Sequence, residues 1–260
     1  MHVTSRRAAI RQFLTARGSC SVAALASAVG ASAETIRRDV RAMEGQGLLE
    51  RVHGGVTLPE LTREPEFRMR LHRNAAAKQM IARLAAAEIE SGDSLMTDTG
   101  STTAYVARAL ADHSDLLLVT NGVEIARTVA TGNRSNHAYV AGGELRGDDA
   151  ATFGAEAIGF VERFRVRHAV ISIGAIHPEH GLMDYHLAEA EFCRAVMARA
   201  AHVIVVADHS KFQSQAPVKV CDLECVHTIV TDRPPPPAFR RHFENGALRL
   251  VVPAQADRQA

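Results

Sequence analysis

The stretch that decides the fold is residues 32–55, SAETIRRDVRAMEGQGLLERVHGG. At helical spacing, Ile36, Val40 and Met43 line one side of this stretch, and Gly47 ends the pattern. The apolar stripe therefore predicts a short helix with one buried face. The glycine predicts the end of that helix.

The opposite side of the same helix is basic. Thr35, Arg37, Arg38 and Arg41 point away from the stripe, and Ser32 stands where an N-cap belongs because its hydroxyl can accept a bond from a first-turn amide. A short helix with a buried back and an arginine front has the shape that enters a DNA major groove. The alternative is an amphipathic helix whose arginines are merely solvated.

Two short apolar runs follow, at residues 48–52 and 56–58, and they flank His53, Gly54 and Gly55. This pattern predicts a small hairpin, or wing, beside the helix. Arg51 and His53 are further candidates for contact with DNA, while His53 could equally be a turn residue that donates to the backbone.

The residues before this stretch complete the motif. Residues 5–17 carry an apolar stripe, and the stretch after Ser21 carries a second one that ends at Gly30. Two short helices joined by a three-residue turn containing glycine form a helix-turn-helix. We expect one core, made by Ile10, Phe13, Leu25, Val29, Ile36 and Val40.

Composition and charge fit a cytoplasmic binding protein of two domains. The chain has 260 residues with 47% hydrophobic and 23% charged, and it shows no signal peptide and no apolar run long enough to span a membrane. Its four irregularly spaced cysteines do not resemble a disulfide framework. Residues 1–58 hold eight arginines and four acids, a net charge of +4, and the remainder is mildly acidic, as in a nucleic-acid reader joined to a sensor.

The rest of the chain predicts an α/β domain. Residues 59–75 are a charged, proline-containing connector, and residues 74–90 form a helix with Met80, Ile81, Leu84 and Ala85 inward. Short β-rich runs then alternate with helical stretches, which predicts a mainly parallel sheet covered by helices. The runs are 95–97, 116–120, 138–141, 169–173, 203–207, 228–231 and 248–252.

Parallel sheets of this kind bind ligands beyond the carboxyl ends of their strands. The first run ends in Asp98, Thr99, Gly100, Ser101, Thr102 and Thr103, whose free amides and hydroxyls suit a phosphate at a helix N-terminus. The alternative is a plain N-capped helix start. Other strand ends supply Asn121, Gly142, Gly143, Arg146 and Lys211, and the two cations could bind phosphate or pair with neighbouring acids.

Asp184 and Glu189, before and inside a helix at 187–200, are candidate acceptors for a ligand hydroxyl, or else capping acids. Two groups of residues could suggest a metal site. His177, His180 and His186 lie close in sequence, and residues 221–227 offer two thiols and an imidazole, but neither spacing is a known structural zinc pattern. We expect no metal and no cofactor.

These motifs resemble those of a known family. The TIRRD sequence at 35–39, followed by the leucine pair and HGG, is similar to the DeoR family of bacterial transcriptional regulators. That resemblance implies a winged helix-turn-helix with Thr35, Arg37 and Arg38 on the operator, and Ser32, Arg41, Arg51 and His53 beside them. It implies domains at 1–58 and 76–252, a linker at 59–75 and a tail at 253–260.

The second half also resembles the family, whose sensor domain is similar to sugar-phosphate isomerases and deaminases. DTGSTT, TNG, GGELRG and ADHSKF carry this resemblance, and ADHSKF with TDRPPPP at 231–237 resembles the repressors of the glycerol-3-phosphate regulon. Residues 176–181, near the expected pocket, differ from the sequence that those repressors usually carry there. The resemblance therefore does not fix the identity of the effector.

The expected function is that of a homo-oligomeric, non-enzymatic repressor of a carbon-metabolism operon. It would bind double-stranded operator DNA and be released by a phosphorylated sugar or polyol, with glycerol 3-phosphate as the first candidate. The alternative is a sugar-phosphate isomerase or deaminase with an appended DNA-binding module.

Overall fold

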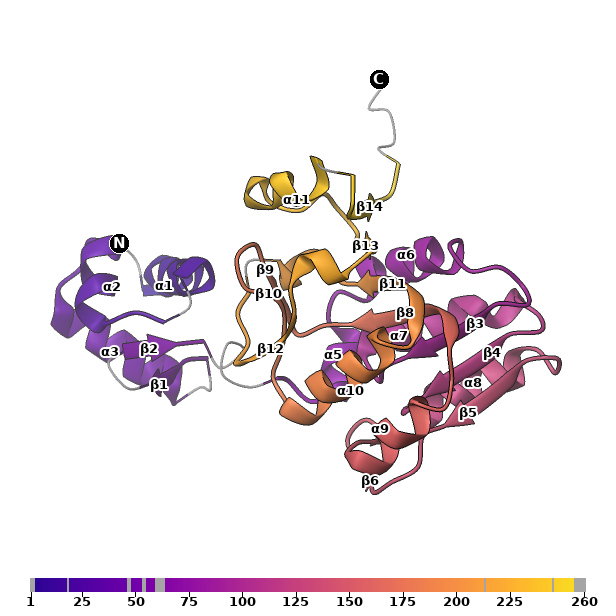
Figure 1. Cartoon of the computed structure of the whole chain (residues 1–260). Helices are drawn as coiled ribbons and strands as arrows, with labels where there is room; N and C mark the ends of the chain where they lie inside the picture. The colour runs from indigo at the N-terminus through magenta and orange to yellow at the C-terminus, as the bar shows by residue number, and fades with distance from the viewer. Residues whose placement is uncertain are drawn as a thin grey trace.

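The chain folds into a small N-terminal body and a larger α/β body (Figure 1). This computed structural model describes residues 3–17, 19–45, 48–52, 55–58, 64–212, 214–244 and 246–254. The predicted fold class, a winged helix-turn-helix followed by a mainly parallel α/β domain, is confirmed.

The N-terminal body holds three helices and a two-stranded wing. Its elements are α1 (Val3–Arg17), α2 (Val22–Val29), α3 (Ala33–Glu44), β1 (Glu50–Val52) and β2 (Gly55–Thr57). The two strands are antiparallel, with Arg51 opposite Val56. Cys20, between α1 and α2, pairs with Val56 through two backbone hydrogen bonds of 3.0 and 2.9 Å.

Local chemistry sets the bounds of α2 and α3. The Ala24 amide donates to the Ser21 hydroxyl at 3.1 Å, and the Thr35 amide donates to the Ser32 hydroxyl at 3.2 Å. Each serine therefore satisfies one of the free amides of a first turn. Gly30 ends α2 with φ 67°, a conformation that glycine adopts without a steric penalty.

One apolar core holds the three helices and the wing together. The predicted stripe residues Ile36, Val40 and Met43 are buried there, whereas Phe13 is only partly buried and packs at the edge. Gly47, predicted as the end of the stripe, lies outside the described residues. The core also contains Ile10, Leu14, Leu25, Val29, Leu49, Val56 and Leu58.

A buried ion pair crosses this core. Asp39, on α3, is 4% exposed, and its carboxylate accepts a hydrogen bond from the Nε of Arg6 on α1 at 2.5 Å. Arg7 lies 3.5 Å from its other oxygen. A buried carboxylate is tolerated because these guanidinium groups pair with it.

The larger body is built on a seven-stranded sheet in the order β14-β13-β11-β8-β3-β4-β5. Every neighbouring pair in this sheet is parallel. The strands are β3 (Ser94–Thr97), β4 (Leu117–Thr120), β5 (His137–Val140), β8 (Val166–Ser172), β11 (Ala200–Val206), β13 (Thr228–Val230) and β14 (Arg249–Val251). They coincide with the seven runs predicted from sequence.

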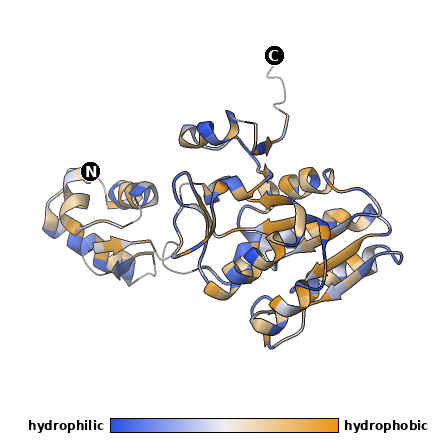
Figure 2. Cartoon of the chain, viewed as in Figure 1, coloured by the Kyte–Doolittle hydropathy of each residue, from blue (hydrophilic) through white to orange (hydrophobic). Residues whose placement is uncertain are grey.

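Alternate residues of these strands face two different cores. Met96, Ala169 and Val205 belong to one core, while Leu95 and Val170 belong to the other. Each face is covered by helices, so the strands are apolar on both sides, as their colour shows (Figure 2). The helices are α6 (Ala75–Ala86), α7 (Ser101–Ala109), α8 (Val123–Gly132), α9 (Ala155–Val161), α10 (Leu187–Met197) and α11 (Arg240–Glu244).

Several elements were not predicted. A three-stranded antiparallel sheet joins β9 (Ala175–His177), β10 (Gly181–Asp184) and β12 (Val218–Cys221). A hairpin joins β6 (Leu145–Arg146) to β7 (Ala151–Thr152), and 3₁₀ turns lie at Leu110–Asp112, His209–Lys211, Leu223–Cys225 and Pro237–Phe239. The strands of this small sheet mix apolar residues with polar ones such as His177, Asp184 and Lys219, so they do not stand out as apolar runs.

Two expectations for the start of this body are corrected. The connector contains a helix, α5 (Phe67–His72), and Met80 is 39% exposed instead of facing inward. The inward face of α6 is instead formed by Lys78, Ile81, Ala82 and Ala85. Among the described residues, the helices are too short or too polar to cross a bilayer.

The Asp39 ion pair gives a test of the N-terminal core. Asp39→Ala is expected to lower the free energy of unfolding by about 1.5–3 kcal/mol, because it leaves a part-buried guanidinium without its charged partner. Urea denaturation of the full chain measures this loss. Glu34→Ala removes an exposed carboxylate paired with Arg37 on the same helix and is expected to cost about 0.2–1 kcal/mol. Equal costs for the two variants would contradict the assigned role of Asp39.

Candidate nucleic-acid interface and effector site

The exposed face of α3 carries the predicted arginines. Arg37, Arg38 and Arg41 are all exposed, and Arg37 pairs with Glu34 at 3.2 Å across one helical turn. The ion pairs of the described residues do not include Arg38 or Arg41, so both guanidinium groups are available to a partner. The hydroxyls of Ser32 and Thr35 lie 2.8 Å apart at the start of the helix.

A hollow of about 430 Å³ separates α3 from the wing. Arg37, Arg41 and Arg51 line it, and Arg51 is held 3.1 Å from Glu44. Three guanidinium groups around one hollow suit an anionic backbone such as that of DNA. His53, the remaining predicted contact, lies outside the described residues.

Gly55 fixes the position of the wing. A Cβ at this position would lie 2.4 Å from the Cys20 carbonyl oxygen, closer than atoms can approach. The backbone of β2 can therefore pair with Cys20 only because residue 55 has no side chain. This close contact ties the wing to the segment between α1 and α2.

The second candidate site surrounds the loop at 98–103, at the carboxyl end of β3. The Asp98 carboxylate accepts hydrogen bonds from the Ser172 amide at 2.9 Å and the Ser172 hydroxyl at 2.7 Å. Burial raises the pKa of Asp98 to about 7, against the lowering effect of these bonds. A Cβ on Gly100 would lie 1.8 Å from the Ser172 Oγ, so the loop requires glycine here.

The hydroxyls of this loop have different roles. Thr103 is fully buried, accepts a bond from the Gly100 amide at 2.9 Å and donates to the Asp98 carbonyl at 3.1 Å, so it supports the loop. Thr99 donates to the Asn121 side chain at 3.0 Å, tying the ends of β3 and β4 together. Thr102 is buried as well, and Ser101 faces a lysine described next.

Lys78, on α6, was missed by the sequence analysis. It is 3% exposed, and its Nζ donates to the Ser101 hydroxyl at 2.8 Å and to the Arg70 carbonyl. Burial lowers its pKa to about 8, while the charge of Asp208 opposes that shift. A signal existed: Lys78 shares the apolar stripe with Ile81 and Ala85, where a lysine is unusual.

Arg146 is committed to two carboxylates. Its Nε lies 3.0 Å from Asp149 and its Nη2 lies 2.5 Å from Glu189, and the guanidinium sits 4.3 Å from the centre of the Phe153 ring. Burial lowers its pKa, but the bonds to both acids outweigh burial and raise it. The alternative given for Arg146, a cation paired with neighbouring acids, is the arrangement observed.

Asp184 and Lys211 lie within the same charged region. Asp184 ends β10, is 5% exposed and accepts a bond from the Tyr185 amide at 2.8 Å; burial and then the charge of Glu189 raise its pKa. Burial lowers the pKa of Lys211, and the charges of Glu64 and Asp208 oppose this.

Two of the expected residues, both glycines, make no hydrogen bond to the loop at 98–103 within the described chain, and their role stays a prediction. Gly142 and Gly143 follow β5 and are exposed, and Gly143 packs beside the Phe153 carbonyl. Their GGELRG motif leads into the β6–β7 hairpin that carries Arg146.

Two residues of the connector enter this region, which the sequence analysis did not foresee. Glu64 lies 2.7 Å from Arg70, and their side chains are 6% and 12% exposed. Burial raises the pKa of Glu64, whereas the charge of Arg70 lowers it. Glu64 also lies within 4.8 Å of the possible ligand atoms of His186 and Glu189, more than 120 positions away, and no local pattern predicts that contact.

The suggested metal ligands do not gather as expected. The rings of His177 and His180 stack at 4.4 Å, and the His177 Nδ1 accepts the Glu179 amide at 3.1 Å. Within the described ranges, one group of three possible ligands occurs, Glu64, His186 and Glu189. Its two carboxylates are already paired with arginines, an arrangement that does not suit a cation.

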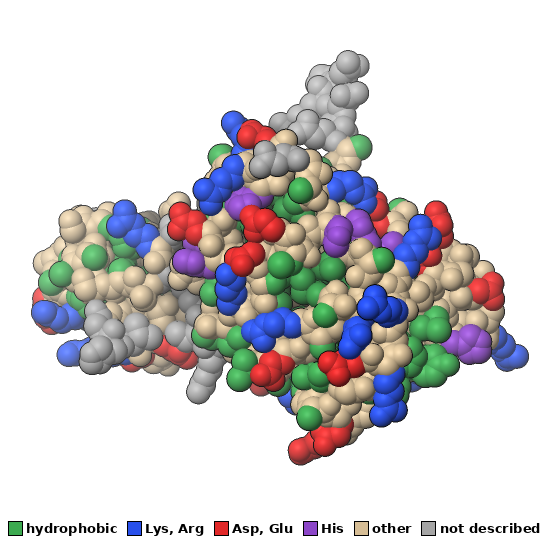
Figure 3. Space-filling model, viewed as in Figure 1, with side chains coloured by type: hydrophobic (Ala, Val, Ile, Leu, Met, Phe, Trp, Pro, Cys, Tyr) green, Lys and Arg blue, Asp and Glu red, His purple; other side chains and the backbone are tan. Residues whose placement is uncertain are grey.

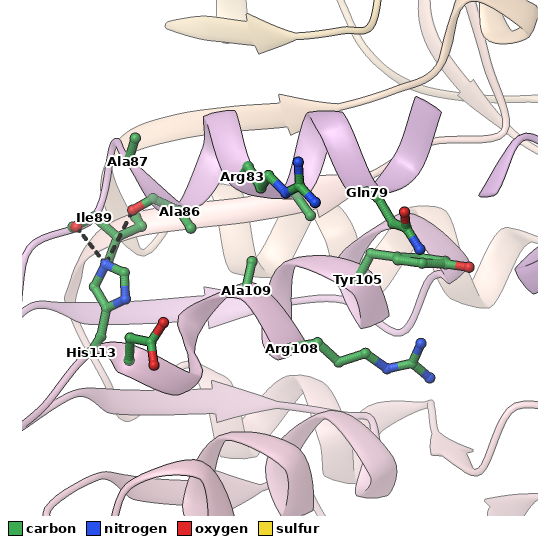
Figure 4. Close-up of a pocket in the computed structure, with 11 residues that line it drawn as sticks. Gln79, Arg83, Ala86, Ala87, Ile89, Tyr105, Arg108, Ala109 and His113 are labelled. Atoms are coloured by element: carbon green, nitrogen blue, oxygen red, sulfur yellow. Dashed lines mark hydrogen bonds between the residues drawn. The ribbon is translucent and has the colours of Figure 1, made fainter. Parts of the chain in front are cut away.

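Another hollow, of about 600 Å³, lies between α6 and α7 (Figure 4). Its polar lining includes Gln79, Arg83, Tyr105 and Arg108, and His113 bonds to the carbonyls of Ala86 and Ile89 at its edge. None of the predicted effector residues lines it. On the face in Figure 3, acidic and basic side chains are interspersed over the larger body, without a field of one sign.

The chain joins a basic winged helix-turn-helix to a doubly wound α/β domain with charged residues at its strand ends. This combination defines a DNA-binding regulator with a sensor domain. Residues 6–62 match the DeoR-like helix-turn-helix domain, and residues 73–233 match the DeoR C terminal sensor domain. The chain belongs to the DeoR family.

Individual relatives agree along nearly the full length. The HTH-type transcriptional repressor CsqR of Escherichia coli is 31% identical over 92% of this chain and 91% of its own. The glycerol-3-phosphate regulon repressor of the same organism is 33% identical over 97% of this chain and 100% of its own.

Among solved structures, ribose 5-phosphate isomerase A from Methanocaldococcus jannaschii is 15% identical, with a TM-score of 0.39 over 54% of this chain and 55% of its own. At this TM-score the likeness carries no inference about function.

The raised pKa of Asp98 predicts a pH dependence. Between its unfolded value of 3.8 and about 7, this carboxyl binds more protons in the folded chain than in the unfolded chain. Its contribution to stability is therefore fully present below pH 3.8 and is lost as the pH rises towards 7. We expect the wild type to lose stability relative to Asp98→Asn over this window, as measured by urea denaturation at several pH values.

Asp115→Asn is the matched control. Asp115 is exposed, and its φ of 58° suits asparagine as well as aspartate. Its stability curve should run parallel to that of the wild type. If the curve of Asp98→Asn is parallel as well, Asp98 is ionised throughout and the pKa assignment is wrong.

Proposed function

We propose that this chain is a transcriptional repressor that binds operator DNA through α3 and is released by a phosphorylated small molecule bound beside the loop at 98–103. The observation that carries the proposal is the free arginine face of α3 in a DeoR-family chain. The first candidate effector is sn-glycerol 3-phosphate, because one of the similar repressors is named for that regulon.

The roles of the arginines follow from their surroundings. Arg38 and Arg41 are exposed and outside the ion pairs, so they can reach base edges, where arginine reads guanine through two hydrogen bonds. Arg37 and Arg51 are already oriented by Glu34 and Glu44, which suits contact with phosphates.

A homo-oligomer is part of this proposal. Two helix-turn-helix modules read adjacent major-groove faces when they lie about 34–36 Å apart, or at multiples of that spacing. A single chain supplies one module, so a dimer or tetramer is needed. An effector then acts by favouring an arrangement of modules that binds DNA weakly.

The sensor site can bind a phosphate ester with hydroxyl groups. Lys78 and Lys211 supply positive charge near Ser101, and the free amides at the start of α7 add hydrogen-bond donors. Asp98 and Asp184, with raised pKa values, are poised to exchange hydrogen bonds with ligand hydroxyls.

We propose binding without turnover. The competing function is a sugar-phosphate isomerase or deaminase, with Asp184 and Glu189 as acid and base. Glu189, however, is held 2.5 Å from Arg146, so its carboxylate is already engaged within the protein. Turnover of ribose 5-phosphate or glucosamine 6-phosphate that is abolished by Asp184→Asn would establish the enzyme instead.

Arg38→Ala tests the reading helix. We expect it to weaken operator binding by about 1–3 kcal/mol, because it removes a base-contacting guanidinium. Fluorescence anisotropy on labelled operator DNA measures the loss. Arg134→Ala removes an exposed arginine from the sensor domain with the same change in charge and should leave the affinity unchanged. An equal loss of operator affinity in both variants would show that only net charge matters, and would contradict the assigned role of Arg38.

The effector site is tested in the same assay. Labelled DNA from the upstream region of the chain's own gene is titrated at two salt concentrations, and sn-glycerol 3-phosphate and then other sugar phosphates are added. We expect salt-sensitive binding that one phosphate ester reverses. Lys211→Gln should abolish the reversal, and Lys219→Gln, at an exposed lysine paired with Asp222, should preserve it. DNA binding that no phosphate disturbs would contradict the effector site alone.

A further inference from the structure

The segment between the two domains is docked on the sensor by polar contacts. This connector segment, residues 64–78, contains α5 and the start of α6. The Phe67 amide donates to Asp148 at 3.0 Å, and the Tyr105 hydroxyl donates to the Leu71 carbonyl at 3.0 Å. Asn74, held at φ 53°, donates to Asp208 at 3.0 Å.

The first described residue of the connector segment reaches the effector site. Glu64 is paired with Arg70 at 2.7 Å, and the possible ligand atoms of Glu64, His186 and Glu189 all lie within 4.8 Å of one another. Against the effects of burial, the charge of Lys211 lowers the pKa of Glu64, and the charge of Glu64 raises the pKa of Lys211. A buried carboxylate from the connector segment thus occupies the centre of the sensor's charges.

The cations around Glu64 are those that a bound phosphate requires. Arg70, Lys78 and Lys211 lie close enough to affect one another electrostatically, and Lys78 bonds to Ser101 in the loop at 98–103. Three cations held close together repel one another unless anions lie among them. Glu64 supplies one negative charge, whereas a phosphate monoester supplies nearly two and three acceptor oxygens.

We propose that Glu64 is a resident substitute for the effector's phosphate, and that a phosphate monoester displaces it and frees the start of the connector segment, residues 64–67, from the sensor. This inference rests on the proposed function and assigns the regulation of the same site. It requires that Glu64 and phosphate compete for Arg70 and Lys211. It also identifies Lys78 and Arg70 as ligand contacts contributed by the connector segment.

Release of residues 64–67 would reach the DNA-binding domain directly. Five residues, 59–63, separate Glu64 from Leu58, the last described residue of the N-terminal core. Displacement of residues 64–67 therefore changes the positions that the helix-turn-helix can take relative to the sensor. Operator binding depends on the spacing between two such modules, so freeing their connectors weakens it.

Competition makes a definite prediction for Glu64→Gln. The variant keeps the size of the side chain but removes the charge that opposes phosphate. Isothermal titration of the full chain with inorganic phosphate, and then with sn-glycerol 3-phosphate, should give roughly tenfold tighter binding than in the wild type. Glu66→Gln makes the same change at an exposed position two residues away and should bind within about twofold of the wild type.

Hydrogen exchange gives a second readout in the unaltered chain. Saturating phosphate should speed exchange of the Phe67 amide of the wild type, which is bonded to Asp148 at the start of α5. In Glu64→Gln this amide should exchange fast before phosphate is added. Slower exchange on phosphate binding would overturn the inference, because it would show that the connector segment closes on the ligand.

The outcomes separate this inference from the function on which it rests. Equal phosphate affinities in the wild type and Glu64→Gln overturn the role of Glu64 and leave a phosphate-released repressor intact. Absence of phosphate binding in all three proteins removes the effector site, and the inference falls with it. Operator binding, measured by anisotropy, remains an independent result in either case.

Discussion

The charge balance at the carboxyl ends of the parallel strands is the constraint on which the rest of the sensor depends. Buried charges are tolerated where each has a partner, and single unpaired ones are costly. Here Lys78 and Lys211 face Asp208 and Glu64, and Arg146 binds Glu189. Part of this balance is supplied from outside the sheet, by the connector. The domain that senses and the segment that leads to the DNA-binding domain are therefore held together by the same charges.

Much of the fold follows from local pattern. Ser32 caps α3, and Ile36 and Val40 face the core as predicted. All seven strands of the parallel sheet overlap the predicted runs. These features depend on the order of neighbouring residues, so helical periodicity and apolar runs reveal them. The small antiparallel sheet was missed because its short strands contain polar residues such as His177, Asp184 and Lys219 and do not form continuous apolar runs. The domain limits at 58 and 76 stay predictions.

The candidate sites were less readable than the fold. The arginines of α3 follow from one helix, so their exposure could be expected from spacing alone. Arg146 was found, but its partner Glu189 lies 43 positions away, and only the folded chain brings them together. Lys78 meets Ser101, and Glu64 approaches His186 and Glu189, only in the folded chain as well. Sequence locates the strand ends, whereas the pairing of charges there is a property of the tertiary structure.

The strand order has a consequence for how the chain is made. β3 lies inside the sheet, between β4 and β8, yet β8 follows it by about 70 residues, with β4 and β5 in between. Because a nascent chain emerges from its N-terminus, β3, β4 and β5 can pair with α7 and α8 while the other edge of β3 is still bare. That edge presents unpaired backbone N–H and C=O groups until β8 pairs with it. The pairing of β3 with β8 joins the two neighbouring strands that lie furthest apart in the sequence, and such non-local pairing is slow. The rate at which residues 98–172 are synthesised therefore sets how long the half-formed sheet can associate with other chains.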